Sequence, residues 1–201
     1  MAGTLAVLHD RFVFNRRTQV LAAHFCDLLP RDAAVLDVGC GDGTIDLLIQ
    51  ASRPDVSIRG VDVFVRPTAK IPVQHFDGLK LPFDDRSFDA VTFVDVLHHT
   101  DDPAILLREA ARVSRKAVII KDHTMDGLLA YGTLRLMDWV GNAPHGVVLP
   151  YNYWPERRWR ETFKAIGLEI GEWRASVGLY PWPASLLFDR RLHFVARLAA
   201  S

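Results

Sequence analysis

The stretch Val35-Leu36-Asp37-Val38-Gly39-Cys40-Gly41-Asp42-Gly43-Thr44 decides the fold of this chain. It predicts a short apolar strand that runs into a tight glycine turn and then directly into a helix. Glycine accepts backbone conformations that other residues avoid, and it lets a ligand approach the main chain closely. An acidic residue, Asp37, lies near the end of the strand. We therefore interpret the stretch as a cofactor-binding turn.

Composition restricts the class of protein. The 201 residues are 49% hydrophobic and 24% charged, which is typical of one globular domain. Lys plus Arg equals Asp plus Glu at 24 each, which argues against a nucleic-acid partner. The two cysteines favour a reducing, cytoplasmic setting without a disulfide framework. No apolar run approaches the roughly 20 residues that span a bilayer, so we expect no stable membrane insertion.

Strands and helices are expected to alternate over the first 122 residues. The helices are predicted at 12–29, from Asp42 to 52, and at 103–113 behind an Asp102 cap and Pro103. The strands are predicted at 33–37, 57–63, 71–76, 88–95 and 117–120. This alternation indicates an α/β fold with a mostly parallel sheet.

Acidic residues recur where these strands end, at Asp37, Asp62, Asp77, Asp95 and Asp122. Ligands of open α/β sheets bind outside the carboxyl ends of the strands. The repetition therefore predicts one binding edge, although each residue taken alone could equally cap a helix or form a turn.

The last third of the chain has a different pattern. We expect apolar helix over part of 123–150, a helix over 155–165 closed by Gly167, and an antiparallel pair of strands at 168–177 and 192–198. The single domain 1–201 then divides into an N-terminal helical segment (1–30), a cofactor-binding core (31–122), a lid or substrate region (123–167) and C-terminal strands (168–201).

Two cofactor classes compete for the glycine turn. A dinucleotide fingerprint needs a third glycine where Thr44 stands. A carboxylate at Asp37 suits a ligand ammonium group better than a pyrophosphate. Asp62 suits a ribose diol in either class, because one carboxylate can accept two hydroxyl hydrogen bonds. An NAD-type oxidoreductase therefore stays open as an alternative.

Four segments in order resemble the class I S-adenosylmethionine-dependent methyltransferases. They are similar to the type 11 group, which includes the ubiquinone and menaquinone C-methyltransferases. The segments are Val35 to Gly43, Asp77-Gly78 to Leu81-Pro82-Phe83, Ser87-Phe88-Asp89-Ala90-Val91, and Val96-Leu97-His98-His99. The resemblance covers residues 33–122. It implies a three-layer, Rossmann-like sheet of seven strands with an antiparallel C-terminal hairpin.

The resemblance also implies roles for individual residues. Asp37, Gly39 and Gly41, with Cys40 between them, would hold the methionine part of S-adenosylmethionine. Asp62 would take the ribose hydroxyls with Val63 beside it, and Asp77 with Gly78 would meet the adenine. Asp95 would lie near the sulfonium. No family pattern carries over beyond residue 123, so the acceptor is not implied.

Methyl transfer needs a general base only if the acceptor must lose a proton. The candidates for catalysis are His123, His98 and Asp95, with a loop-orienting role as the alternative for the histidines. Met137 and Trp139 are candidate wall residues of an apolar or aromatic acceptor pocket, and His145 and Tyr151 are candidate substrate contacts. We expect no metal ion, a small-molecule acceptor and, as a further alternative, a homodimer. A non-catalytic S-adenosylmethionine-binding protein of the same fold also stays open.

Overall fold

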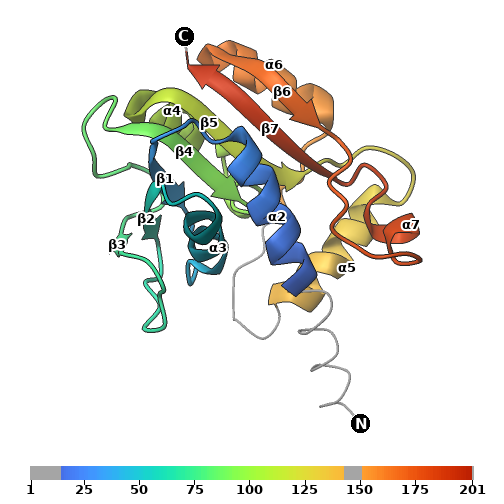
Figure 1. Ribbon diagram of the computed structural model, residues 1–201. Coiled ribbons are helices and arrows are strands. Elements are labelled where there is room, and N and C mark those ends of the chain that lie inside the picture. Colours follow the sequence, from blue (N-terminus) through green and yellow to red (C-terminus); the bar gives the residue numbers. More distant parts are fainter. Residues whose placement is uncertain (1–14, 143–150, 201) are drawn as a thin grey trace.

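The opening stretch supplies an inner strand, β1 (Ala34–Val38), of a seven-stranded sheet in the computed structural model, which describes residues 15–142 and 151–200 (Figure 1). The strands lie in the order β3-β2-β1-β4-β5-β7-β6. The other strands are β2 (Ser57–Asp62), β3 (Val73–His75), β4 (Phe88–Val94), β5 (Ser114–His123), β6 (Leu168–Arg174) and β7 (His193–Ala200).

All neighbours from β3 to β5 pair in parallel, whereas β7 pairs antiparallel with both β5 and β6. The register sets Asp37 of β1 beside Thr92 of β4. The expected mostly parallel sheet with an antiparallel C-terminal pair is confirmed.

Helices cover both faces of the sheet (Figure 1). The described helices are α2 (Asn15–Leu28), α3 (Thr44–Ser52), the short 3-10 helix η2 (Leu97–His99), α4 (Pro103–Val113), α5 (Ala130–Asn142), α6 (Glu156–Ile166) and α7 (Ser185–Phe188), of which α5 and α7 lie beyond the end of the sheet. Among the described residues, none of the helices combines the length and the apolar character that crossing a bilayer requires.

Alternation along β1 places its side chains in two separate cores. Val35 packs with Phe25 of α2 and Ile49 of α3. Leu36 points the other way and packs with the core that contains Leu107 of α4 and Trp159 of α6. A strand covered on both faces needs apolar residues at successive positions, which explains the continuous apolar run in the sequence.

The start of α4 and the end of α6 lie where the sequence predicts. Asp102 accepts a hydrogen bond from the Ala104 amide at 3.0 Å and Pro103 is the first helical residue of α4. Gly167 ends α6 with a left-handed φ of 81°. At α3 the Asp42 carboxylate accepts from the Thr44 amide and hydroxyl, but Gly43 occupies the cap position.

Other bounds differ from the prediction. The strand expected at 117–120 runs from Ser114 to His123, because Lys121, Asp122 and His123 are buried polar residues that continue the ladder. The strand expected at 71–76 is only three residues long, since it pairs on one side at the sheet edge. Residues 12–14 of the first predicted helix lie outside the described residues.

Candidate active site

The glycine turn after β1 packs closely against its neighbours. Gly39, Gly41 and Gly43 all have left-handed backbone, with φ of 73°, 59° and 72°. A Cβ on Gly39 would lie 2.5 Å from Val96 Cγ2, and one on Gly43 would lie 2.7 Å from Ile71 Cγ1. Both the conformation and the space therefore require glycine at these two positions.

A cavity of about 290 Å³ lies at the carboxyl ends of β1, β4 and β5. The glycine turn forms part of its wall, and a cluster of histidine and aspartate side chains forms another part. It is lined by Arg17, Thr18, Leu21, Asp37, Gly39, Cys40, Gly41, Asp42, Thr44, Ile45, Arg66, Val94, Asp95, His98, His99, His123, Met137, Asp138 and Tyr180. Its position is where open α/β sheets bind ligands.

Asp62, at the end of β2, is joined to the glycine turn. Its Oδ2 accepts a hydrogen bond from the Gly41 amide at 2.9 Å, and its Oδ1 accepts from the Phe64 amide at 2.9 Å. A carboxylate oxygen has a second lone pair, so each oxygen can still accept one ligand hydroxyl. The carboxylate is thereby fixed in place next to the cavity with the capacity to bind a vicinal diol.

Besides Asp62, which adjoins Gly41 but is not itself a lining residue, four predicted cofactor residues do not form the cavity wall in the way expected. Asp77 is exposed, and its Oδ1 accepts from the Leu79 and Lys80 amides at 2.8 Å. Gly78 lies against Val63, which is 58% exposed. Asp77, Gly78 and Val63 are absent from the cavity lining, whereas Cys40 belongs to it but packs its sulfur against Gly60.

Asp37 is a buried carboxyl group at the base of the turn. It accepts a hydrogen bond from Thr92 Oγ1 at 2.7 Å. Burial, followed by the nearby Asp46 carboxylate, raises the pKa of Asp37 well above its usual range. Burial also raises the pKa of Asp46 to about 7. Burial therefore favours the protonated form of these carboxyl groups, and a cationic ligand at Asp37 would favour loss of the proton.

Asp95, directly after β4, is the centre of a partly buried ion-pair network. It forms ion pairs with Lys121 of β5 and Arg17 of α2. Burial opposes ionisation of Asp95, but the two cations outweigh it and hold the pKa of this carboxyl well below its usual range. The residue adopts a left-handed φ of 56°, which is uncommon for a side chain larger than glycine.

His98 of η2 lies between two carboxylates. Its Nδ1 donates to Asp122 Oδ1 at 2.7 Å, and its Nε2 is 3.4 Å from Asp138 Oδ2. Burial lowers the pKa of His98, but Asp122 and then Asp138 more than offset this and raise it to about 10. The surroundings of the ring therefore favour a positive charge.

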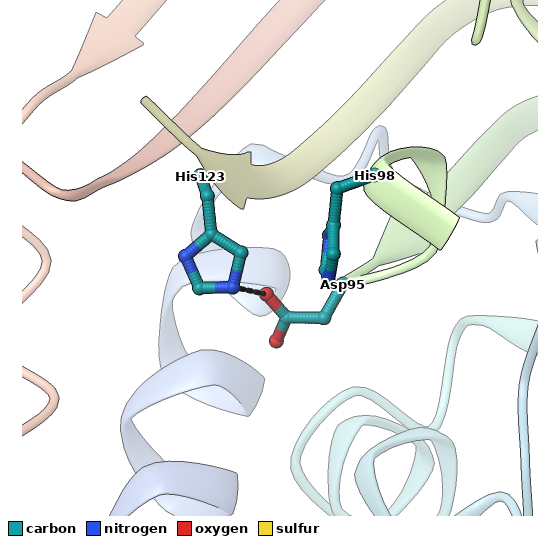
Figure 2. A group of neighbouring side chains, drawn as sticks. All are labelled: Asp95, His98 and His123. Carbon is teal, nitrogen blue, oxygen red and sulfur yellow. Dashed lines mark ion pairs between the residues drawn. The ribbon is translucent and has the colours of Figure 1, made fainter. Parts of the chain in front are cut away.

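His123, the last residue of β5, faces the Asp95 carboxylate. Figure 2 shows its Nε2 turned toward Asp95, at 3.3 Å from Oδ1, with His98 reaching toward Asp95 from η2. The Nδ1 atom is 3.3 Å from the Leu192 carbonyl oxygen. Burial, followed by the Lys121 charge, lowers the pKa of His123 well below 6.5. Its surroundings therefore favour the neutral ring.

The structure brings Asp37, Gly39, Cys40, Gly41, Asp95, His98 and His123 to one cavity. Sequence reasoning missed Arg17, Lys121, Asp138 and Tyr153, whose hydroxyl donates to Asp138. The one available signal was Lys121, a lysine at the end of an apolar strand.

Met137 lines the cavity as predicted, but Trp139 does not and is 60% exposed. Tyr151 packs beside Tyr153 outside the lining, and His145 lies outside the described residues.

Comparisons with known proteins agree on one family. A family model described as a methyltransferase domain matches residues 8–172. The 27-O-demethylrifamycin SV methyltransferase of Amycolatopsis mediterranei is 29% identical over 49% of this chain and 41% of its own length. A ubiquinone/menaquinone biosynthesis C-methyltransferase of Desulfotalea psychrophila is 35% identical over 42% and 38%. The chain thus spans about two fifths of these curated relatives.

Solved structures show the same fold. A chain from the complex between the Haloferax volcanii Trm112 methyltransferase activator and a methyltransferase superimposes with a TM-score of 0.69 at 18% identity, covering 97% of this chain and 95% of that one. The family's cofactor is S-adenosylmethionine, which carries a vicinal diol and an ammonium group. The fixed Asp62 carboxylate and the buried Asp37 beside the cavity fit those two groups. The chain belongs to the methyltransferase domain family, within the class I S-adenosylmethionine-dependent methyltransferases.

Proposed function

We propose that this chain transfers a methyl group from S-adenosylmethionine to a small, apolar or aromatic acceptor. One observation carries the proposal: a single cavity extends from Gly39 and Gly41 to His98 and His123. A methyl donor held at the glycine turn would therefore face an acceptor beside the histidines. Holding the two reactants side by side accelerates a displacement reaction, because a step within one complex replaces a bimolecular encounter.

The cofactor roles follow the order of the strands. Asp37 with the backbone of Gly39 and Gly41 holds the methionine part, and Asp62 takes the ribose hydroxyls. Asp77, Gly78 and Val63 meet the adenine at the rim. Three large apolar side chains are exposed there, as an adenine-covered surface would need: Val63, Phe64 and Leu79 are 58%, 69% and 57% exposed.

The cofactor supplies an electrophilic methyl carbon, and the chain's own residues position the acceptor and receive its proton. His123 lines the cavity, and the Leu192 carbonyl oxygen beside its Nδ1 favours the tautomer with the N–H on that atom. The lone pair is then on Nε2, so we assign Nε2 as the proton acceptor, and Asp95 at 3.3 Å would stabilise the N–H that forms there. Asp95, fixed by Lys121 and Arg17, is a positioning residue for His123 and for the cofactor. His98 positions the loop after β4 through its bond to Asp122.

The acceptor class rests on the lining of the cavity. Leu21, Ile45, Met137 and Tyr180 offer apolar and aromatic surface, which suits a small organic acceptor. The balanced charge and the two free cysteines support a small-molecule substrate and a cytoplasmic setting. A homodimer is part of the same proposal.

Ligand-induced shifts of the melting temperature test the cofactor. S-Adenosylhomocysteine should raise the melting temperature, and NADH should not. Asp62→Ala should weaken S-adenosylhomocysteine binding at least tenfold, while Asp84→Ala, an exposed carboxylate of the connector before β4, should leave it unchanged. A shift with NADH alone would instead favour the oxidoreductase.

A transfer assay with labelled cofactor tests the chemistry. A panel of phenols, hydroxyquinones and small amines should include a methylated product. His123→Gln should abolish that product while S-adenosylhomocysteine still binds. Cofactor binding without transfer to any acceptor of the panel would favour the non-catalytic binding protein.

A further inference from the structure

We propose that His98, His99 and Asp138 form a binding site for a divalent first-row transition-metal ion, which the sequence did not lead us to expect. One ligand atom from each residue lies within 4.8 Å of the other two. The two histidines come from η2 and the aspartate from α5, and all three line the cavity. The inference rests on the proposed function, because it concerns the acceptor end of the same cavity.

His98 has the orientation of a metal-bound histidine. Its Nδ1 donates to Asp122, whose other carboxylate oxygen accepts from the Leu97 amide at 3.0 Å. Histidine ligands usually donate the second ring N–H to such a carboxylate, which fixes the ring. The His98 side chain is 1% exposed, and its Nε2 lies 3.4 Å from Asp138 Oδ2 but makes no hydrogen bond with the described residues. A metal ion bound between these two atoms would give the buried nitrogen a partner.

His99 and Asp138 complete the donor set. The His99 Nδ1 is also buried without a hydrogen-bond partner within 15–142 and 151–200. Its ring centroid is 4.0 Å from that of His98. The Tyr153 hydroxyl donates to Asp138 and fixes that carboxylate. Metal–ligand bonds of about 2.0–2.2 Å set neighbouring ligand atoms roughly 3–4 Å apart, and the ligand atoms here, all within 4.8 Å of one another, are near that spacing.

A second group, Asp95 with His98 and His123, has a similar spacing. Asp95 is already ion-paired with Lys121 and Arg17, so a metal ion at this carboxylate would lie beside two positive charges. His98, in contrast, lies between the carboxylates of Asp122 and Asp138. Their negative charge favours a cation at its Nε2, and we therefore choose the group with His99 and Asp138.

Two imidazoles and one carboxylate suit zinc, iron, manganese or cobalt, whereas magnesium and calcium prefer ligand sets made of oxygen alone. Three protein ligands leave coordination positions open, as in catalytic metal sites. An acceptor hydroxyl that entered the cavity would complete the coordination, and a metal ion lowers the pKa of an oxygen ligand. The geometry thus points to hydroxyl-bearing acceptors.

Cobalt(II) is the probe, because its visible absorption reports the ligand set directly. The full chain is stripped with a chelator, titrated with Co²⁺, and in parallel loaded with Zn²⁺, gel-filtered and subjected to elemental analysis. We expect about one ion per chain and visible bands of a low-coordinate site. His99→Ala and Asp138→Asn should bind at least tenfold more weakly. His75→Ala, on the exposed edge strand β3, is the matched control and should bind like the wild type.

S-Adenosylhomocysteine binding is measured on every variant, which separates lost metal binding from misfolding. The metal site is overturned if the wild type retains no ion, or if His99→Ala and Asp138→Asn retain as much as His75→Ala. Cofactor binding without metal binding would reject this site and leave the proposed function intact. Metal binding without cofactor binding would reject the proposed function instead. A hydroxyl acceptor should change the cobalt spectrum, and an analogue with hydrogen in place of the hydroxyl should not.

Discussion

Lys121 and Asp95 form an ion pair in which the lysine side chain is completely buried, and Arg17 pairs with the same carboxylate. Removing one partner of a buried pair typically costs about 3–5 kcal/mol, because the other charge stays in the interior. Asp95→Asn leaves two cations, whereas Lys121→Met leaves Asp95 paired with Arg17. Asp95→Asn should therefore lower the free energy of unfolding in urea by the larger amount.

The double variant Asp95→Asn with Lys121→Met is the control for this prediction. It removes the buried lysine together with its partner, so it should recover part of the stability lost in Asp95→Asn. Equal losses for the two single variants, or no recovery in the double variant, would contradict the assigned network.

The carboxyl pair Asp37 and Asp46 predicts a pH dependence of stability. Their folded-state pKa values are raised, that of Asp46 to about 7. A raised carboxyl pKa means that the folded protein binds the proton more tightly than the unfolded chain does. The stability that this tighter proton binding gives the folded protein is fully present below the ordinary pKa of 3.8. It is lost as the pH rises toward 7. The slope is up to about 1.4 kcal/mol per pH unit for one proton.

Urea unfolding of the wild type and Asp46→Asn, at a series of pH values from 4 to 8, measures this contribution. The stability of the variant relative to the wild type should increase over that range. Asp84→Asn provides the control at an exposed position and should show no such trend. A constant difference between Asp46→Asn and the wild type at every pH would show that the pair titrates normally.

Alanine at Gly39 should be more harmful than alanine at Gly178. The two glycines have nearly the same left-handed φ, 73° and 72°. A left-handed conformation costs a non-glycine residue about 1–2 kcal/mol in either place. Only Gly39→Ala also drives a methyl group to 2.5 Å from Val96, because no atom lies within 4 Å at Gly178. Urea unfolding and S-adenosylhomocysteine titration should both separate the variants, and equal effects would show that backbone strain alone matters.

Replacing tryptophan by phenylalanine should affect stability at Trp159 but hardly at Trp139. Trp159 is fully buried, and its Nε1 donates to the His123 carbonyl oxygen at 3.0 Å. Trp159→Phe removes this bond inside the core and should cost about 1–3 kcal/mol. Trp139 is 60% exposed, so Trp139→Phe should stay within about 0.5 kcal/mol of the wild type. Chemical denaturation of both variants provides the comparison.

Local sequence patterns predict the strand and the glycine turn that line one part of the cavity. The glycine turn, Asp37 and Asp62 belong to short strand-and-turn segments whose geometry depends on neighbours along the chain. The ends of α4 and α6 are predictable for the same reason, since a cap residue, a proline or a glycine determines them locally.

The opposite wall could not be predicted in the same way. Arg17 and Asp138 lie on helices far apart in the sequence, and only tertiary packing turns them toward Asp95 and His98. Lys121 interrupts an apolar pattern, which shortened the predicted strand although the residue is buried by its ion pair. Trp139 was misassigned because helical periodicity in 123–150 is too weak to distinguish the inner face of α5 from its outer face.

The position of β7 between β5 and β6 has a consequence for how the protein is made. A ribosome releases β6 before β7, so β6 has no strand to pair with until β7 has emerged. The Leu192 carbonyl oxygen that lies against the His123 ring directly precedes β7. The half of the site at the glycine turn can therefore form early in synthesis, whereas the orientation of His123 is completed by the last strand of the sheet to be synthesised.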